Sequence, residues 1–266
     1  MQGEERVLQE LTFINGSYRT DPHKGWRFFG LFPSFGFYVQ DVVIVFKASH
    51  RAKRSRYDTA AWARSSLEVL RALENVGVKF EITGIDHFKG LDTPCVFIAN
   101  HMSTLETFVL PSIIAPFRDV TFVVKESLVN YPVFKYVMRS RDPVTVGRTN
   151  PREDLKAVLE GGTDRLYSGR SMIVFPQTTR TADFAPSECN TIGVKLAKRA
   201  NVPIVPVALK TDAWANGKHL KDFGRIDPSK KVHFAFGKPL MVRDRGAEEH
   251  EEIIHFITEK LKEWKV

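Results

Sequence analysis

The chain has 266 residues, of which 43% are hydrophobic, and it carries a formal net charge of +8. This length and composition are enough to bury one large core, and no low-complexity linker divides the chain. The charge indicates an anionic partner: nucleic acid, an anionic membrane or a phosphorylated substrate. The sequence contains no zinc-finger spacing and no aromatic ribonucleoprotein block, so a lipid or a phosphate is favoured and no nucleic-acid partner is expected.

Two features bear on the compartment in which the protein works. Cys95 and Cys189 have no spacing typical of a metal site or a disulfide framework, which indicates inert thiols in a reducing compartment. The N-terminal residues are mostly polar, carry Glu4, Glu5 and Glu10, and show no secretory signal. We therefore expect the protein to stay inside the cell and to bind no metal.

The most hydrophobic segment runs from Trp26 to Phe46 and is rich in phenylalanine. Polar residues and a proline interrupt it, so it falls short of the roughly 20 predominantly apolar residues that a membrane-crossing helix requires. Aromatic side chains in one leaflet, with cations at the anionic headgroups, are typical of an interfacial helical pair. The cations that follow this segment are Lys47, Arg51, Lys53, Arg54 and Arg56.

From this pattern we predict two units in the chain. Residues 1–56 form a membrane-associating, amphipathic helical hairpin, and residues 57–266 form the catalytic domain. The alternative is a soluble hairpin whose aromatic side chains cover the core and whose charges are solvated.

Beyond residue 57, helical and strand patterns alternate. Apolar residues recur at near-helical spacing from Ala63 to Leu73, and Gly77 ends this pattern before a strand from Val78 to Ile82. The alternation predicts an α/β fold with a largely parallel sheet flanked by helices. The further predicted strands are 95–99, 120–124, a strand that ends at Arg148, 172–175, 204–209 and 232–236, and the further helices follow residue 101, begin at Pro151, and cover 193–199 and 253–264.

The strand Cys95-Val96-Phe97-Ile98-Ala99 runs directly into Asn100-His101-Met102-Ser103-Thr104-Leu105-Glu106. A buried strand of this kind delivers His101 to the carboxyl edge of the sheet, where open α/β folds bind ligands. Glu106 can reach back across the turn and hold one ring nitrogen, which leaves the other nitrogen free as a base. Ser103 lacks the G-x-S-x-G elbow of hydrolases and suits a helix cap. On this block alone, a catalytic pair and an ordinary loop histidine are both open.

Three cations follow apolar, strand-like runs. Arg148 and Arg180 would reach the same sheet edge as His101, where together they could bind one phosphate of a substrate. Lys125 follows the predicted strand Thr121–Val124 in the same way. Solvated surface charge is the alternative for all three.

Four blocks, in this order, resemble the signatures of the glycerolipid acyltransferases, the family that includes 1-acylglycerol-3-phosphate acyltransferase. They are Asn100-His101-x-Ser103-x-x-Glu106, Val144-Thr145-Val146-Gly147-Arg148, Phe175-Pro176-Gln177-Thr178-Thr179-Arg180-Thr181, and Val202-Pro203-Ile204-Val205-Pro206-Val207. Four blocks in order are far more specific than any one of them.

The resemblance implies transfer of a fatty acyl group from acyl-coenzyme A or acyl carrier protein to the free hydroxyl of a lysophospholipid, in phospholipid biosynthesis. The favoured acceptor is 1-acylglycerol 3-phosphate, and no cofactor beyond the acyl donor is implied. His101 would be the general base and Glu106 its partner. The resemblance also implies substrate contacts from Lys125, Arg148, Gln177, Thr178, Thr179 and Arg180. With the basic, aromatic N-terminal segment, it favours a peripheral or monotopic protein on the cytoplasmic face of an anionic membrane.

The chain departs from the family pattern at three positions. Gln177 stands where the family usually has Glu, Thr178 where it has Gly, and Glu106 where Asp is commoner. These departures bear on the acceptor more than on the reaction, so an acyltransferase acting on a different lyso-lipid is one alternative. A non-catalytic membrane lipid-binding protein is another. The intact pair of His101 and Glu106 argues against it, because a partly buried charged pair costs stability.

Overall fold

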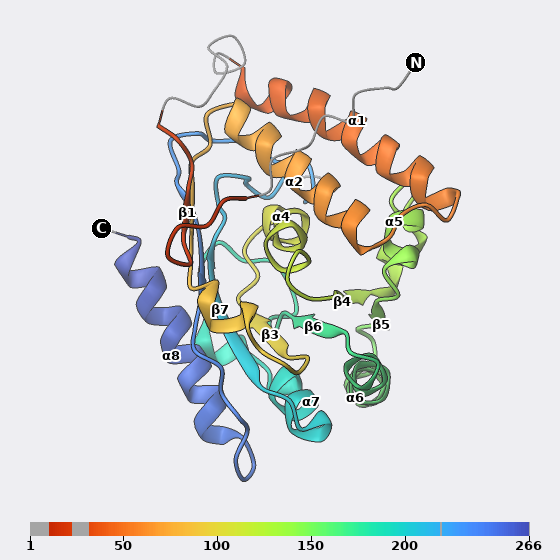
Figure 1. Ribbon diagram of the computed structural model, residues 1–266, viewed down its shortest axis with the longest axis vertical. Coiled ribbons are helices and arrows are strands. Elements are labelled where there is room, and N and C mark those ends of the chain that lie inside the picture. Colours follow the sequence, from red (N-terminus) through yellow and green to blue (C-terminus); the bar gives the residue numbers. More distant parts are fainter. Residues whose placement is uncertain (1–10, 23–31, 219, 266) are drawn as a thin grey trace.

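The computed structural model describes residues 11–22, 32–218 and 220–265 (Figure 1). The strands are β1 (Tyr18–Arg19), β2 (Phe80–Thr83), β3 (Val96–Ala99), β4 (Val120–Lys125), β5 (Val144–Val146), β6 (Ser171–Val174), β7 (Ile204–Lys210) and β8 (Val232–Phe236). The α-helices are α1 (Pro33–Lys53), α2 (Thr59–Asn75), α3 (Asp86–Lys89), α4 (Leu105–Ile114), α5 (Lys135–Ser140), α6 (Pro151–Tyr167), α7 (Ile192–Ala200) and α8 (Ala247–Glu263). Within the described part of the chain, the 3-10 helices η2 (Glu126–Asn130) and η3 (Pro186–Glu188) lie in the connections.

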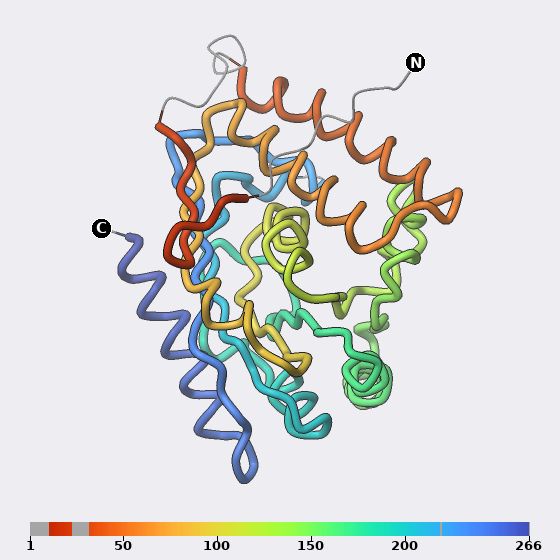
Figure 2. Tube along the Cα trace, viewed as in Figure 1, coloured from red at the N-terminus to blue at the C-terminus, as the bar shows by residue number. Residues whose placement is uncertain are grey.

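The strands form one sheet in the order β1-β2-β8-β7-β3-β6-β4-β5. The five strands from β7 to β5 are parallel neighbours, whereas β8 runs antiparallel to β7 and β1 antiparallel to β2. Helices α2 and α4 contribute to the core on one face, and α6, α7 and α8 to the core on the other (Figures 1 and 2). The predicted α/β fold with a largely parallel, helix-flanked sheet is confirmed.

The central strand β3 is buried along its whole length. An unbroken apolar run suits this position, because both faces of a parallel sheet are covered by helices. Where β3 ends, the Asn100 side chain takes over the pairing with β7. Its Nδ2 donates to the Leu209 carbonyl at 2.8 Å, and its Oδ1 accepts from the Leu209 N–H at 2.8 Å. The turn that carries His101 therefore begins from a fixed point.

The N-terminal helices differ from the predicted hairpin. Residues 33–46 belong to a single helix, α1, which continues to Lys53 and packs against α2 across the predicted boundary at residue 56. Trp26, Phe28 and Phe29 lie outside the described residues. Before α1, strand β1 already joins the sheet, and the hydroxyl of Thr20 donates to the buried Glu74 of α2 at 2.7 Å.

Helix α1 is two-sided. Phe37 is fully buried against the Trp214 ring, with ring centroids 4.7 Å apart. The opposite face exposes a stripe of apolar side chains at helical spacing, which are Phe35, Val39, Val42, Val43 and Phe46, and the exposed Phe32 directly precedes the helix. Among the described residues, no helix combines the length and the apolar character needed to cross a membrane.

Candidate active site

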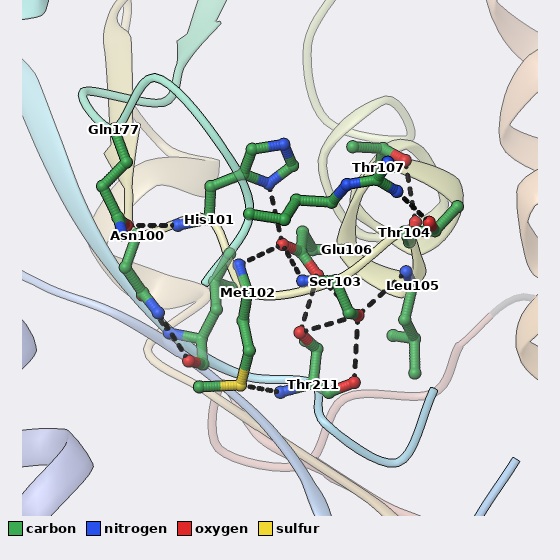
Figure 3. A network of polar contacts seen from close by, with 12 residues as sticks. Asn100, His101, Met102, Ser103, Thr104, Leu105, Glu106, Thr107, Gln177 and Thr211 are labelled. Carbon is green, nitrogen blue, oxygen red and sulfur yellow. Dashed lines mark hydrogen bonds and ion pairs between the residues drawn. The ribbon is translucent and has the colours of Figure 1, made fainter. Parts of the chain in front are cut away.

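The two residues of the first block meet at the carboxyl end of β3. Nδ1 of His101 lies 2.9 Å from Oε1 of Glu106 (Figure 3). The Glu106 side chain is fully buried, and the His101 side chain is 13% exposed. No hydrogen bond joins Nε2 of His101 to a described residue, so this nitrogen can face a substrate. The structure thus has the geometry of a base held by a carboxylate.

Glu106 lies at the start of α4, in a nest of donors (Figure 3). Its oxygens accept hydrogen bonds from the Met102 N–H at 2.7 Å, the Ser103 N–H at 2.8 Å and the Thr211 hydroxyl at 2.6 Å. Burial alone would raise the pKa of Glu106, but His101, Thr211 and the Ser103 N–H together lower it below the ordinary value. The residue is therefore a carboxylate at neutral pH.

Ser103 belongs to the support of this carboxylate. Its hydroxyl lies 3.0 Å from Oε2 of Glu106 and 3.0 Å from the hydroxyl of Thr211, and it accepts from the Leu105 N–H at 3.1 Å. An oxygen engaged in this way is not an activated nucleophile, which agrees with the absence of a hydrolase elbow around it.

The third block fixes the orientation of the histidine. The Phe175 ring stacks on the imidazole of His101, with centroids 4.2 Å apart and planes at 15°. Oε1 of Gln177 accepts from the His101 N–H at 2.7 Å, while its Nε2 donates to the Thr181 hydroxyl at 2.8 Å. Gln177 is only 3% exposed. It therefore supports the backbone of the turn at His101, and the structure does not place it on the surface of an acceptor pocket.

The two predicted arginines approach each other at this edge. Arg148 follows β5 and donates from Nη1 to the Thr178 carbonyl. Burial lowers the pKa of Arg148, Asp154 opposes this, and the positive charge of Arg180 lowers it further. Since Thr178 lies two residues before Arg180 in the chain, this contact brings Arg148 to the segment that carries Arg180.

Arg180 is tied to the turn that carries His101. Its Nη1 donates to the Thr104 hydroxyl and to Oδ1 of Asp222, the latter at 2.7 Å. Beside it, the exposed Thr179 accepts a hydrogen bond from Lys221 at 3.1 Å. The exposed Thr178 also lies at this edge.

Lys125 is the predicted residue that the structure does not bring into this network. It ends β4, pairs in register with Val146 and has an exposed side chain. Sequence reasoning in turn missed Thr211 and Asp222. Thr211 directly follows the strand of the fourth block and could have been found as the first polar residue at that sheet edge. Asp222 lies in a loop outside all four blocks, and no sequence pattern marks it as a site residue.

In the described ranges, no group of three or more His, Cys, Asp or Glu side chains could hold a metal ion.

Comparison with known proteins decides the family. A family model described as Acyltransferase matches residues 79–210 of this chain. The chain belongs to the glycerolipid acyltransferase family. In this family, it is 28% identical over 155 residues to a 1-acyl-sn-glycerol-3-phosphate acyltransferase from Pseudomonas aeruginosa, with 58% of each chain covered.

Two further glycerolipid acyltransferases extend the comparison. The 1-acyl-sn-glycerol-3-phosphate acyltransferase of Saccharomyces cerevisiae is 24% identical over 208 residues, which cover 77% of this chain and 67% of that protein. The crystal structure of the 1-acyl-sn-glycerophosphate acyltransferase from Thermotoga maritima superimposes with a TM-score of 0.66 at 19% identity, covering 89% of this chain and 96% of that one. That likeness is one of fold. The chain spans 58% of the Pseudomonas protein and 37% of a chloroplastic relative from Brassica napus.

A first prediction concerns the support of Glu106. Replacing Thr211 with Val removes a hydroxyl donor from a fully buried carboxylate, so the free energy of unfolding should fall by about 1 to 3 kcal/mol at pH 7. Because folding lowers the pKa of Glu106, the stability that its charge contributes is complete above the ordinary value of 4.5 and is lost as the pH falls through the lowered value. The penalty of Thr211→Val should therefore shrink below pH 4.5.

Urea unfolding of the wild-type protein and of Thr211→Val at pH 7 and pH 4 measures this penalty. Thr149→Val is the matched control, because Thr149 is exposed on the surface. Equal stability of Thr211→Val and the wild-type protein at pH 7 would show that the carboxylate does not need this donor.

Proposed function

We propose that this protein is an O-acyltransferase that moves a fatty acyl group from acyl-coenzyme A or acyl carrier protein to the free hydroxyl of 1-acylglycerol 3-phosphate. The proposal rests on His101 as a base: its Nδ1 is held by the buried Glu106, and its Nε2 has no hydrogen-bond partner among the described residues. Arg148 and Arg180 lie at the same edge of the sheet. The names of the curated relatives support the same acceptor.

The proposed mechanism follows from these positions. Nε2 of His101 takes the proton of the acceptor hydroxyl as its oxygen attacks the thioester carbonyl. The tetrahedral intermediate collapses with loss of the thiolate, which receives the proton back from the imidazolium. Glu106 stabilises that imidazolium and fixes the tautomer, so no covalent acyl-enzyme is required. Arg148 and Arg180 bind the acceptor phosphate by charge-assisted hydrogen bonds.

The burial of Gln177 bears on the alternative of a different lyso-lipid acceptor. Since this side chain is engaged by His101 and Thr181, the change from Glu to Gln acts on the turn rather than on the charge of an open pocket. Thr178 is the exposed departure from the family pattern, so it is the position at which an altered acceptor preference would arise.

The experiment that tests the proposal is an acceptor panel. Purified protein is incubated with palmitoyl-coenzyme A and a set of lysophospholipids and monoacylglycerol, and the acylated products are identified by mass spectrometry. We expect phosphatidic acid from 1-acylglycerol 3-phosphate as the main product. A different main product would support the alternative acceptor, and no product from any acceptor would support a lipid-binding protein.

In this assay, His101→Ala should lower turnover by at least roughly 10²-fold, because a positioned general base is lost. Glu106→Gln should cost less, since the imidazole survives without its orienting carboxylate. His255→Ala is the control, because His255 is exposed on α8. Wild-type turnover of a folded His101→Ala protein would exclude the proposed mechanism.

Arg180→Ala should chiefly raise the KM for a phosphate-bearing acceptor. The lost charge-assisted contact would weaken binding by about 2 to 4 kcal/mol, while the KM for the acyl donor should change little. Arg148→Ala should act in the same direction, and Arg199→Ala, on an exposed position of α7, serves as the control. Normal kinetics with lysophosphatidic acid in both active-site variants would show that the phosphate binds elsewhere.

We also propose that the exposed stripe of α1 lies against an anionic membrane, with the basic residues after it at the headgroups. Each buried methylene contributes about 0.8 kcal/mol and each nearby Lys or Arg about 1 kcal/mol. A deletion of residues 1–56 would also remove the buried Phe37 and the hydroxyls of Tyr18 and Thr20 that donate to Glu74, so substitutions on the stripe are the cleaner test.

The triple variant Phe35→Gln, Val43→Gln, Phe46→Gln should lose most of its flotation with vesicles that contain anionic lipid. Wild-type binding should weaken with salt yet persist in part through the aromatic side chains. Tyr167→Gln with Met241→Gln is the matched control, because both side chains are exposed apolar groups outside α1. A wild-type protein that does not float at low salt would indicate that α1 only covers the core.

A further inference from the structure

The loop between β7 and β8, described for residues 211–218 and 220–231, contacts the site through Thr211, Asn216 and Asp222. Its first residue, Thr211, donates to Glu106 at 2.6 Å. Asn216 donates from Nδ2 to the Met102 carbonyl at 3.0 Å, which holds the turn between His101 and Glu106. Asp222 forms the ion pair with Arg180. We call this segment the bracing loop, and none of the four sequence blocks contains it.

The bracing loop is itself fixed against α1. The Tyr38 hydroxyl donates to the Gly224 carbonyl at 2.6 Å, and the Ile226 N–H donates to the Ser34 hydroxyl at 2.9 Å. The Tyr38 ring also lies 5.7 Å from the Phe223 ring, centroid to centroid. Asp222 therefore lies on a segment with anchors on both sides.

The hydrogen bonds of Arg180 use one edge of its guanidinium. Nη1 carries two hydrogens, and its two acceptors are Thr104 and Asp222. Nε and Nη2 form no hydrogen bond with any residue that the structure describes. Neither nitrogen is buried, so both are accessible to a ligand. These two N–H groups point the same way from the guanidinium, in the spacing that matches two oxygens of a phosphate.

We propose that Asp222 is a positioning residue for the acceptor phosphate. It holds Nη1 of Arg180 and so presents the Nε/Nη2 edge to the phosphate; this inference rests on the proposed function. Thr104, the second acceptor, lies in the turn between His101 and Glu106. Through these two contacts, the phosphate and the base are held at a set distance, which places the acceptor hydroxyl at Nε2.

A stabilising role for the ion pair is a poor explanation of its presence. The Asp222 side chain is 42% exposed, and the Arg180 side chain is 18% exposed. Ion pairs that are this solvated contribute little to the free energy of unfolding. The alternative functional role is that Asp222 competes with the phosphate for Arg180. In that case, removing the Asp222 carboxylate would lower the KM for the phosphate-bearing acceptor rather than raise it.

The test compares Asp222→Ala and Asp222→Asn, with Asp227→Ala as the control. Asp227 lies on the same loop and bonds to Ser229 rather than to the site. Acylation kinetics are measured with lysophosphatidic acid and with monoacylglycerol, which lacks the phosphate. Binding of lysophosphatidic acid without donor is measured by calorimetry.

We expect Asp222→Ala to raise the KM and the Kd for lysophosphatidic acid by about tenfold, with little change in kcat and no change in the KM for monoacylglycerol. Asp222→Asn, which keeps the acceptor oxygen, should restore most of the affinity, and Asp227→Ala should match the wild-type protein. This pattern would not arise from a general loosening of the loop, which would lower kcat for both acceptors through the contact between Thr211 and Glu106.

Three results would overturn the inference. A lower KM for lysophosphatidic acid in both Asp222 variants would show that Asp222 competes with the phosphate. If the wild-type protein acylates lysophosphatidic acid and the Asp222 variants have the same KM and Kd as the wild-type protein, Asp222 has no role in positioning. The proposed function would then still stand. A wild-type protein that neither binds nor acylates any phosphate-bearing lysolipid would contradict both.

Discussion

The arrangement of the site depends on one constraint: a fully buried carboxylate must be satisfied by hydrogen bonds. Glu106 meets it with donors from two parts of the chain. One is the turn before α4, with the imidazole of His101 and the Met102 N–H, and the other is the hydroxyl of Thr211 directly after β7. Leaving such a group without donors costs more than the bonds contribute when formed. The hydrogen bonds to this one carboxylate thus connect His101, the turn and the end of β7.

The other contacts extend this network outward. Gln177 joins the third block to the backbone of His101, and Arg180 joins the same block to Thr104 in the turn. The group that would take the proton and the group that would bind the phosphate therefore share one short segment as their support. Precise placement of reacting groups of this kind is a large part of enzymatic rate enhancement.

The sequence predicted the parts of the molecule that depend on periodicity. Strands β2 to β8, helices α2, α4, α6, α7 and α8, and the pair of His101 and Glu106 follow from apolar patterns and short spacings, and the structure has them, whereas β1, α3 and α5 were not predicted. It did not predict that residues 33–53 form one helix or that Thr211 and Asp222 enter the site. These depend on contacts between segments far apart in the chain, and a single sequence contains no local signal for them.

The antiparallel pairing of β7 with β8 has a consequence for how this fold can diverge. A parallel neighbour must be reached by a crossover that returns to the far edge of the sheet, whereas an antiparallel neighbour begins where the previous strand ends. β7 therefore ends at the edge at which β3 presents His101, and β8 begins at that same edge. Insertions or exchanges in this connection can reshape the acceptor side while the strand register is kept. The topology thus separates the part of the protein that can vary from the part that must stay constant.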